Sequence, residues 1–519
     1  MPPSLAFPHP HVIEYPVREL VFQSVGQFKA EVLAHMPVTL RITRNPHQDP
    51  TQVVRKSLDL YNDDAVGKLV KTVAERFAMG SEYIREQLLG FVEQLEQHRL
   101  TESEKLLRQK GQKKVVALPP LTDTQQERLQ GLLRSPDLSN ELSELLGVSG
   151  IVGEESNRIS VVYLLLSYMT GETLHIMIQG SSGSGKTTLM HKVTAIFPPS
   201  RVNRITRMTD SSLYNFARYA LQNTILAIED YDGLSEEAEF ALREMQTNNV
   251  LRSAVSTKDE NGHIESGIKE VHGPIATIFC TTHGTVYHDN MSRLFILAMD
   301  ESEGQTKRII DYQNRKAAGL IDRDKEKEAL LLLQHLIQGL AAYEVINPYA
   351  TRVYLPVRDE AQRRLNGLYQ QFVRMVTLLY QHQRTKDNQG RLVSDKQDIA
   401  IAIQLLFEVI VLKVDELDGS LRQFFERLKT YIRRQLKQRK NGRTESEYLF
   451  TQRELRQALQ LSKSQVFRYL HDLTELEYIR QSGGYQNKGY SYQVVYWDDY
   501  KKLREGIKAN LMDQLNAIE

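Results

Sequence analysis

The feature that most constrains this chain is a short run rich in glycine and serine near residue 180. It reads Gly180-Ser181-Ser182-Gly183-Ser184-Gly185-Lys186-Thr187 and matches the pattern G-x-x-x-x-G-K-[ST] at every fixed position. An apolar run at 173–178 precedes it, and residues 187–197 have the pattern of a helix. A strand, a glycine-rich turn and a helix in this order predict a loop whose backbone N–H groups surround phosphate groups.

Each part of this loop has an expected role in binding ATP. The glycines let backbone N–H groups face inward, and the helix N-terminus adds a positive partial charge. Lys186 is expected to reach the β- and γ-phosphates, and the hydroxyl of Thr187 is expected to bind Mg²⁺. The expected nucleotide-binding residues are Gly180, Ser181, Ser182, Gly183, Ser184, Gly185, Lys186, Thr187 and Thr188. The alternative, a chance glycine and serine loop, does not explain the strand and helix on either side.

A pair of acidic residues follows the second apolar run of the chain. The run 224–228 ends in Glu229 and Asp230. One such carboxylate can hold the water shell of Mg²⁺, and the other can orient or deprotonate the attacking water. We therefore predict that Glu229 and Asp230 are catalytic and, with Thr187, bind the metal. The sequence leaves open which acid has which role, Asp232 is close enough to compete, and an ordinary acidic loop is the alternative.

Together these two motifs resemble those of the AAA+ class of P-loop ATPases. A third apolar run, 275–280, ends in Thr281 and Thr282. In AAA+ proteins a polar residue at this point orients the hydrolytic water, which implies that role for Thr281 or Thr282. An ordinary threonine of a β-strand is the alternative. The resemblance also implies an α/β core with a helical lid, and ATP and Mg²⁺ as cofactors.

An arginine follows the third run, within the segment Asn290-Met291-Ser292-Arg293-Leu294-Phe295. This segment resembles the arginine-finger motif Ser-Arg-Phe of the MCM helicases, with Leu294 as one extra residue. The resemblance implies that Arg293 acts on the γ-phosphate held by a neighbouring subunit, so that the active form would be a ring. A surface arginine in a turn is the alternative. Weaker candidates for a sensor within the same subunit are Arg363, Arg364 and Arg374.

Two strand-like runs between the acidic pair and the third apolar run predict a β-hairpin. They are 253–258 and 264–271, joined through an Asn-Gly pair in which both residues tolerate positive φ. A hairpin at this point resembles superfamily 3 and MCM-type helicases, in which it projects into the central pore and grips DNA phosphates. The resemblance implies DNA contacts for Lys258 and His263, which flank the tip. A purely structural hairpin is the alternative.

The segment 446–497 has the pattern of a winged helix. Thr451, with Glu454 three residues later, predicts a capped helix, and Ser462 or Ser464 predicts the cap of a longer second helix. Two strands with a glycine-rich loop between them follow. The expected DNA contacts lie on the outward side of the second helix and on the wing: Ser464, Gln465, Arg468, Tyr469 and Lys488. A protein-interaction module is the alternative.

A basic stretch lies just upstream of this module. Residues 421–443 carry nine lysines and arginines against one acid, Glu426. The whole chain has a net charge of only +1, so any surface that attracts nucleic acid must be local. We predict that this stretch provides such a phosphate-binding surface, with a solvated helix face as the alternative.

The length of 519 residues is enough for three or four domains of about 100–200 residues each. We predict an N-terminal α+β domain at 1–115, an AAA+ core at 123–324, a helical lid with the basic helix at 325–435, and a winged-helix domain at 446–500. The single cysteine, Cys280, excludes a disulfide framework and a multi-cysteine zinc site. Without a secretory signal at the start or a run long enough to cross a bilayer, we expect a cytoplasmic protein with no membrane contact.

The chain also resembles the helicase half of the large primase-helicase proteins of bacterial mobile elements. The resemblance covers about 150–480 and rests on the segments 149–155, 179–186, 229–234, 289–293, 311–316 and 459–463. In those relatives a zinc-ribbon and Toprim primase precedes the motor, whereas this chain has no cysteine cluster. Priming activity is therefore not expected, and a separate primase is the implied partner.

These features predict an ATP-dependent DNA helicase or translocase of a replication or mobile-element system. The expected active form is a homo-oligomeric ring, with a hexamer as the expected number of subunits. Two other functions remain open. One is an ATP-switched replication initiator or helicase loader that binds DNA without unwinding it. The other is a DNA-dependent regulatory ATPase in transposition or phage defence.

Overall fold

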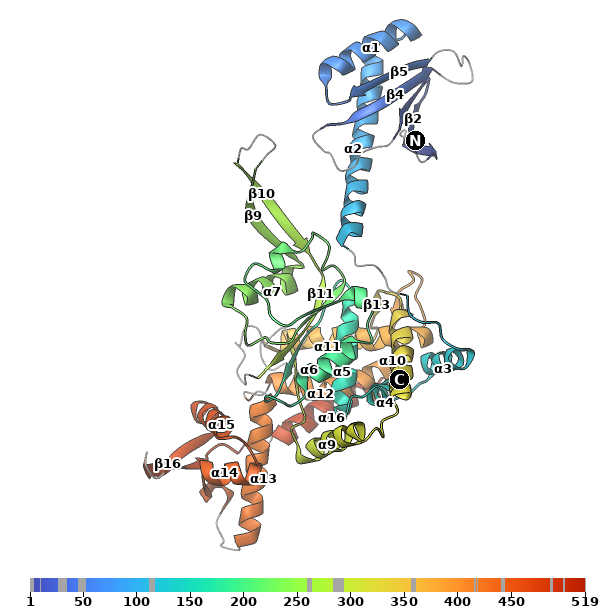
Figure 1. Ribbon diagram of the computed structural model, residues 1–519. Coiled ribbons are helices and arrows are strands. Elements are labelled where there is room, and N and C mark those ends of the chain that lie inside the picture. Colours follow the sequence, from blue (N-terminus) through green and yellow to red (C-terminus); the bar gives the residue numbers. More distant parts are fainter. Residues whose placement is uncertain are drawn as a thin grey trace. The chain divides into compact units, whose positions relative to one another are not determined.

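The computed structural model of the chain describes most of its residues (Figure 1). The described residues are 4–9, 11–26, 35–44, 53–111, 117–258, 264–282, 294–355, 361–414, 417, 419–439, 444–485, 489–497 and 500–518. The chain divides into two compact units, Met1–Gln112 and Lys113–Glu519. None of the described helices is both long enough and apolar enough to cross a membrane.

The N-terminal unit is an antiparallel sheet packed against two helices. Its five strands are neighbours in the order in which they follow along the chain. Buried and exposed side chains alternate along most of β4, which places Val38, Leu40 and Ile42 in one core with Phe22 and Phe77. The elements are β1 (Ala6–His9), β2 (Val12–Val17), β3 (Leu20–Val25), β4 (Pro37–Arg44), β5 (Val53–Asp59), α1 (Asp63–Phe77) and α2 (Ser81–Gly111). The expected α+β fold at the N-terminus is confirmed.

The larger unit contains a five-stranded parallel sheet in the order β12-β6-β11-β8-β7. Every residue of β6, β8 and β11 is buried, because helices cover both faces of the sheet. Ile178 faces one core with α5 and α6, and Met177 faces the other with α7. The elements are α5 (Glu155–Leu166), β6 (His175–Gln179), α6 (Lys186–Thr194), β7 (Val202–Ile205), β8 (Thr224–Ile228), α7 (Glu236–Asn248), β11 (Ile275–Thr281) and β12 (Leu294–Ala298). The predicted α/β P-loop core is confirmed.

Helices from before and after the sheet complete this unit. They are α3 (Asp123–Arg134), α4 (Leu138–Val148), α9 (Glu303–Ala317), α10 (Arg323–Gln338), α11 (Ala361–Leu379), α12 (Lys396–Val414) and α16 (Tyr500–Asn516), with the short strand pair β13 (Val345–Ile346) and β14 (Leu392–Val393). Phe372 of α11 packs its ring 5.5 Å from that of Tyr163 and 6.4 Å from that of Phe295. The helices and one face of the sheet therefore share a single hydrophobic core.

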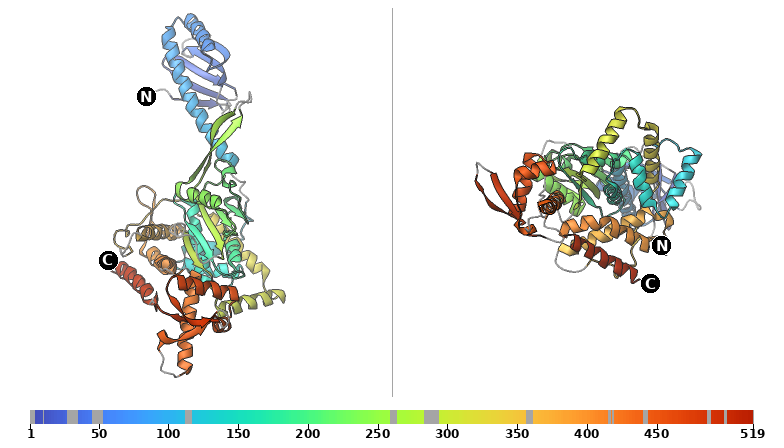
Figure 2. Two further views of the ribbon diagram at one scale, coloured as in Figure 1. Left: turned by 90° about the vertical axis from the view of Figure 1, so that its left-hand side faces the viewer. Right: turned by 90° about the horizontal axis from the view of Figure 1, so that it is seen from below.

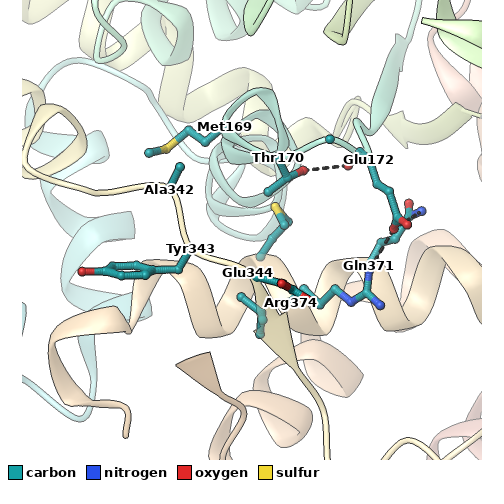
Figure 3. A pocket seen from close by; sticks show the side chains of 11 residues that line it. Met169, Thr170, Glu172, Ala342, Tyr343, Glu344, Gln371 and Arg374 are labelled. Atoms are coloured by element: carbon teal, nitrogen blue, oxygen red, sulfur yellow. Dashed lines mark hydrogen bonds and ion pairs between the residues drawn. The ribbon is translucent and has the colours of Figure 1, made fainter. Parts of the chain in front are cut away.

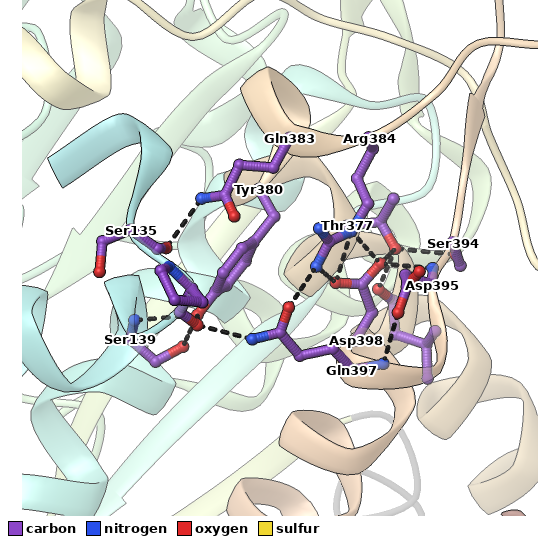
Figure 4. Close-up of polar contacts among 12 residues, drawn as sticks. Ser135, Ser139, Thr377, Tyr380, Gln383, Arg384, Ser394, Asp395, Gln397 and Asp398 are labelled. Carbon is purple, nitrogen blue, oxygen red and sulfur yellow. Dashed lines mark hydrogen bonds and ion pairs between the residues drawn. The ribbon is translucent and has the colours of Figure 1, made fainter. Parts of the chain in front are cut away.

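A buried ion pair fastens α12 to the turn after α11 (Figure 4). Arg384 donates to both carboxylate oxygens of Asp398 at 2.6–3.1 Å. Asp398 also accepts from the hydroxyl of Thr377 at 3.0 Å and from the backbone N–H of Asp395 at 2.8 Å. The side chains of Arg384 and Asp398 are 7% and 0% exposed. Because both buried charges are paired, this cluster serves the structure of the fold. We call the four residues Arg384, Asp398, Thr377 and Asp395 the clasp.

A β-hairpin extends from the core between β8 and β11 (Figure 1). Its strands, β9 (Val250–Lys258) and β10 (Ile264–His272), pair in continuous antiparallel register along both lengths. Near the base, Glu270 accepts from Arg218 at 2.7 Å and from Arg252 at 2.9 Å. Helix α7 packs against β9, so the hairpin is attached to the helix that follows the acidic pair. The predicted hairpin is confirmed.

The described C-terminal segments form a winged helix built around a long helix, α13 (Figure 2). Thr451 and Ser462 cap α14 and α15, each in a capping box with the residue three positions later. Phe424 of α13 stacks on Tyr469 of α15 with ring centroids 4.8 Å apart, so α13 shares the core of this module. The elements are α13 (Gly419–Arg439), β15 (Leu449–Thr451), α14 (Gln452–Leu459), α15 (Lys463–Glu475), β16 (Ile479–Tyr485) and β17 (Gly489–Val494), with sheet order β15-β17-β16.

Candidate functional site

The predicted phosphate loop lies between β6 and α6, beside the carboxyl end of β11. Gly183 and Gly185 have φ of +82° and +95°, a region that residues with a side chain rarely adopt. A β-carbon on Gly180 would lie only 2.6 Å from Ser184 Oγ and 3.1 Å from Met299 Cβ. Ser184 Oγ is buried and has no hydrogen-bond partner among the described residues. The backbone therefore requires these glycines, and the unpartnered hydroxyl fits a loop that binds an anion.

The ammonium group of Lys186 lies inside this loop. Its Nζ donates to the carbonyl oxygens of Gly180 and Ser181 at 2.8 Å each, and the residue is only 8% exposed. Burial lowers the pKa of Lys186, while the charges of Glu301 and Asp232 oppose that shift. The loop thus holds a desolvated cation at the end of the sheet where parallel α/β folds bind phosphate.

The remaining loop residues differ in exposure. Thr187 is half-buried, whereas Ser182 and Thr188 are exposed. The Thr187 hydroxyl lies beside the buried thiol of Cys280, and burial raises the pKa of Cys280 to about 12. Cys280 is therefore a neutral thiol near pH 7, and the Thr187 hydroxyl is the group of this pair suited to a metal ion.

The two acids that the sequence could not distinguish differ clearly in the structure. Glu229 is half-buried, and its Oε1 lies 2.8 Å from Nε2 of His191 on α6. Arg204 lies close enough for its charge to interact with Glu229, although burial lowers the pKa of this arginine. Asp230 is exposed. Glu229 is thus an oriented carboxylate on the α6 side of the sheet, and Asp230 is accessible to solvent.

The third acid, Asp232, contacts the threonines at the end of β11. The Thr281 hydroxyl donates to Oδ1 of Asp232, and the backbone N–H and hydroxyl of Thr282 both donate to Oδ2 at 2.7 Å. Thr281 is 1% exposed. Asp232 therefore orients both threonines and joins the end of β8 to the end of β11.

Helix α15 presents a surface that differs in part from the one predicted, although Ser464 is exposed as expected. Lys463, Ser464, Phe467 and His471 are exposed, and Phe467 is 61% exposed. Tyr469, expected to face outward, is 3% exposed and packs against α13, so that prediction is wrong. Gln465 is engaged in the Ser462 cap, and Arg468 is half-buried with its guanidinium 5.2 Å from the Tyr469 ring.

Comparison with known proteins identifies two domains. A domain family described as the MTBMA_p00010 P-loop domain matches residues 148–341, which contain the loop, the acids and the hairpin. The IclR helix-turn-helix domain matches residues 443–483, which contain α14 and α15. The chain contains a P-loop NTPase domain and a helix-turn-helix domain of a DNA-binding type. No curated protein matches the chain.

Several predicted contacts of this P-loop NTPase lie outside the described residues. They are Arg293, His263 and Lys488, together with the side chains of Lys258, Arg363 and Arg364. The roles proposed for them therefore rest on the sequence.

Arg374, a weaker candidate for a sensor at the nucleotide, lies far from the loop. It donates to Glu172 at 2.8 Å in a pocket of about 460 Å³ (Figure 3). Glu172 lies before β6, and the phosphate loop lies after it. The five residues of β6 span roughly 16 Å, so Arg374, which contacts Glu172, lies at the opposite end of the strand from the loop. Arg374 thus joins α11 to the segment before β6, a position that does not fit the predicted sensor role.

The basic stretch is only partly available to phosphate. Arg422 and Lys429 are 3% and 4% exposed, and both pair with Glu426, at 3.5 and 2.7 Å. Arg427 donates to the carbonyl of Leu459 at 2.6 Å. The prediction of a surface formed by all nine charges is therefore wrong. The exposed cations of the described part of α13 include Arg433, Arg434 and Lys437.

Two residues of the site were not predicted from the sequence. His191 lies five positions after Lys186 on α6, so a helical projection could have placed it near the end of β8. Glu301 accepts from the backbone N–H of Ser181 at 2.5 Å, across 120 positions of sequence. No spacing rule connects Glu301 with the loop, and only the position of β12 beside β6 brings it there.

Proposed function

We propose that this P-loop NTPase is an ATP-driven DNA motor that translocates along DNA and unwinds it. The observation that carries the proposal is the position of the β9–β10 hairpin in the chain. The hairpin begins after the helix that follows Glu229 and Asp230, and it ends at β11, which carries Thr281. A change at either catalytic element therefore has a short covalent path to the hairpin, whose tip is the proposed DNA contact through Lys258 and His263.

The proposed chemistry divides the tasks of the site among these groups. Lys186 and the loop N–H groups bind the phosphates, and the Thr187 hydroxyl with the acids holds Mg²⁺. Glu229 and Asp230 orient and deprotonate the attacking water, and Thr281, fixed by Asp232, helps to align it. Bound ATP would supply the phosphoanhydride bond whose hydrolysis drives movement, and Mg²⁺ would neutralise the charge of its phosphates.

The proposed assembly is a homo-oligomeric ring, with a hexamer as the expected form. In such a ring Arg293 would reach the γ-phosphate bound by the adjacent subunit, so a monomer would hydrolyse ATP slowly. A separate primase is the proposed partner, because the primase-helicase proteins that the sequence resembles carry a zinc-ribbon primase, and the 519 residues of this sequence hold a single cysteine.

Strand displacement on a forked DNA with ATP tests the motor directly. The expected result is unwinding by the wild type and none by Asp230→Asn, which keeps the size of the side chain and removes its charge. ATP hydrolysis stimulated by DNA but without unwinding would contradict the motor.

A second candidate is an ATP-switched initiator or loader, favoured by the helix-turn-helix domain, a module that reads duplex DNA. A regulatory ATPase in transposition or phage defence would share that behaviour. Combined substitution of Lys258 and His263 separates these functions from the motor. A motor loses unwinding and keeps its basal hydrolysis, whereas a switch retains both DNA binding and its response to ATP.

A further inference from the structure

Helix α15 (Figure 1) carries a large apolar side chain on its outer face. Phe467 is 61% exposed, and its ring lies 6.5 Å from that of His471, one turn further along the helix. A single exposed apolar residue is ordinary on a protein surface, so the position of this ring matters more than its exposure. The residues of α15 that face the core of the module are Val466, Tyr469, Leu470 and Leu473.

The ring lies where a helix-turn-helix domain meets DNA. Helix α15 is the second helix of the pair that the IclR helix-turn-helix domain matches. Such second helices enter the major groove with their N-terminal residues at the base edges. Ser462 caps α15 in front of Lys463, and Phe467 lies one turn beyond Lys463. Lys463, Phe467 and His471 follow at intervals of four and are exposed, so they share the outer face.

The charges around α15 favour the same end of the helix. Lys463 is exposed at its first position, and Arg453 and Arg456 are exposed on the preceding helix, α14. Glu475 is exposed at its last position. The N-terminus of the helix adds a positive partial charge. Since the backbone of a duplex is negative, these charges direct DNA to the half of α15 that carries Phe467.

The chemistry of the ring limits what it can recognise. Phenylalanine has no N–H or O–H group with which to meet a polar base edge. In the major groove guanine, adenine and cytosine present hydrogen-bonding atoms, whereas thymine also presents its apolar 5-methyl group. Contact with this methyl group removes apolar surface from water on both sides. A polar base edge against the ring would instead lose water and gain no hydrogen bond.

We propose that Phe467 is a specificity-determining residue of the winged helix, which reads the 5-methyl group of a thymine in the major groove of duplex DNA. The proposal rests on the DNA binding that the proposed function requires. It adds a base-specific contact to the phosphate contacts proposed for the hairpin and for α13. Lys463, on the same face of α15, holds the adjacent phosphate and has no part in the choice of base.

The experiment compares two duplexes that differ only in this methyl group. One is a duplex of alternating adenine and thymine, which offers thymine in every register, and the other has uracil in place of each thymine. Fluorescence anisotropy measures their binding to the full chain without nucleotide. We expect the wild type to bind the thymine duplex about three- to fivefold more tightly for each methyl group that the ring covers. Phe467→Ala should bind both duplexes equally.

Two further variants serve as controls. Leu449→Ala removes another exposed apolar side chain of the same module, on β15, and should keep the preference for thymine. Lys463→Ala should weaken binding to both duplexes by the same factor and reduce the slope of log affinity against log salt by about 1. Because Phe467 is exposed, Phe467→Ala should unfold at the temperature of the wild type.

The outcomes separate this proposal from the proposed function. Equal binding of the two duplexes by the wild type would overturn the proposal and leave the DNA motor standing. A preference that Phe467→Ala retains would also overturn it, and the ring would then be available to a protein partner. Loss of the preference in Leu449→Ala as well would remove the specific role of Phe467. If the wild type binds neither duplex, duplex binding fails, and this proposal fails with it, whereas unwinding of a fork still tests the motor by itself.

Discussion

Lys186 and Arg384 are both buried cations of the same unit, but their surroundings are opposite. Lys186 donates to two backbone carbonyls, and no carboxylate of the described residues lies within 4 Å of its Nζ. Arg384 bonds to both oxygens of Asp398, which is itself fully buried. Burial lowers the pKa of Lys186. Burial also disfavours the charged form of Arg384, but the hydrogen bonds and charge of Asp398 outweigh it and raise the pKa of Arg384.

This difference indicates that the charge of Lys186 is available to bind a ligand, whereas the charge of Arg384 stabilises the fold. The charge of Arg384 is matched within the fold, so it has little capacity left to attract an anion. The ammonium of Lys186 bonds directly to neutral carbonyls, with the charges of Glu301 and Asp232 acting on it from farther away. An arriving phosphate would provide an opposite charge in direct contact. Removal of Lys186 should therefore affect function, and removal of a member of the clasp should affect stability.

The largest expected effect follows from Lys186→Ala. Loss of this cation should reduce ATP hydrolysis at least about 100-fold, because it removes a preorganised charge at the transferring phosphate. Unfolding should be little affected, since only bonds to two carbonyls are lost. Steady-state ATPase assays beside thermal unfolding test both parts. Normal turnover by this variant would exclude the loop as the catalytic site, and a collapse of stability would make Lys186 a structural residue.

The next effect concerns the clasp. Asp398→Ala leaves Arg384 as a buried, unpaired charge, and we expect the free energy of unfolding to fall by about 3–5 kcal/mol. Chemical denaturation measures this change, and nucleotide affinity at low temperature should be retained because the clasp lies away from the loop.

The control for that experiment removes both charges at once. The pair Arg384→Met with Asp398→Leu replaces the clasp by apolar side chains and should recover most of the stability lost in Asp398→Ala. If the double variant is as unstable as the single one, packing and the bonds to Thr377 and Asp395 dominate over the charges.

Motifs that are contiguous in the sequence predicted the phosphate loop and the hairpin. Contacts between residues far apart in the sequence could not be predicted in this way. The loop could be predicted because the glycines, Lys186 and the flanking strand and helix are contiguous. The hairpin could be predicted because an Asn-Gly pair is itself a turn signal. His191 with Glu229, and Ser181 with Glu301, join residues 38 and 120 positions apart, and their contacts depend on how β6, β8 and β12 pack.

Two errors came from signals that the sequence did contain. On α15 the buried residues Val466, Tyr469, Leu470 and Leu473 follow the spacing i, i+3, i+4, i+7, which places Tyr469 on the inner face. On α13, Arg422 and Lys429 lie four and three positions from Glu426, the spacing at which opposite charges pair on a helix. The number of basic residues in this stretch is therefore larger than the number of charges exposed to bind phosphate.

The smallest predicted effect concerns the DNA-binding module. It compares an exposed cation of α13 with a buried cation that is paired with a carboxylate. Arg434 is exposed on α13, so Arg434→Ala should weaken duplex DNA binding a few-fold and reduce the slope of log affinity against log salt by about 1. Lys429→Ala, at a buried cation paired with Glu426, should lower thermal stability and leave that slope unchanged. Fluorescence anisotropy with a mixed-sequence duplex at several salt concentrations measures both slopes. An unchanged slope for Arg434→Ala would mean that this exposed charge on α13 does not contact phosphate, and DNA binding would then depend on other parts of the chain, such as α15, the wing or the hairpin.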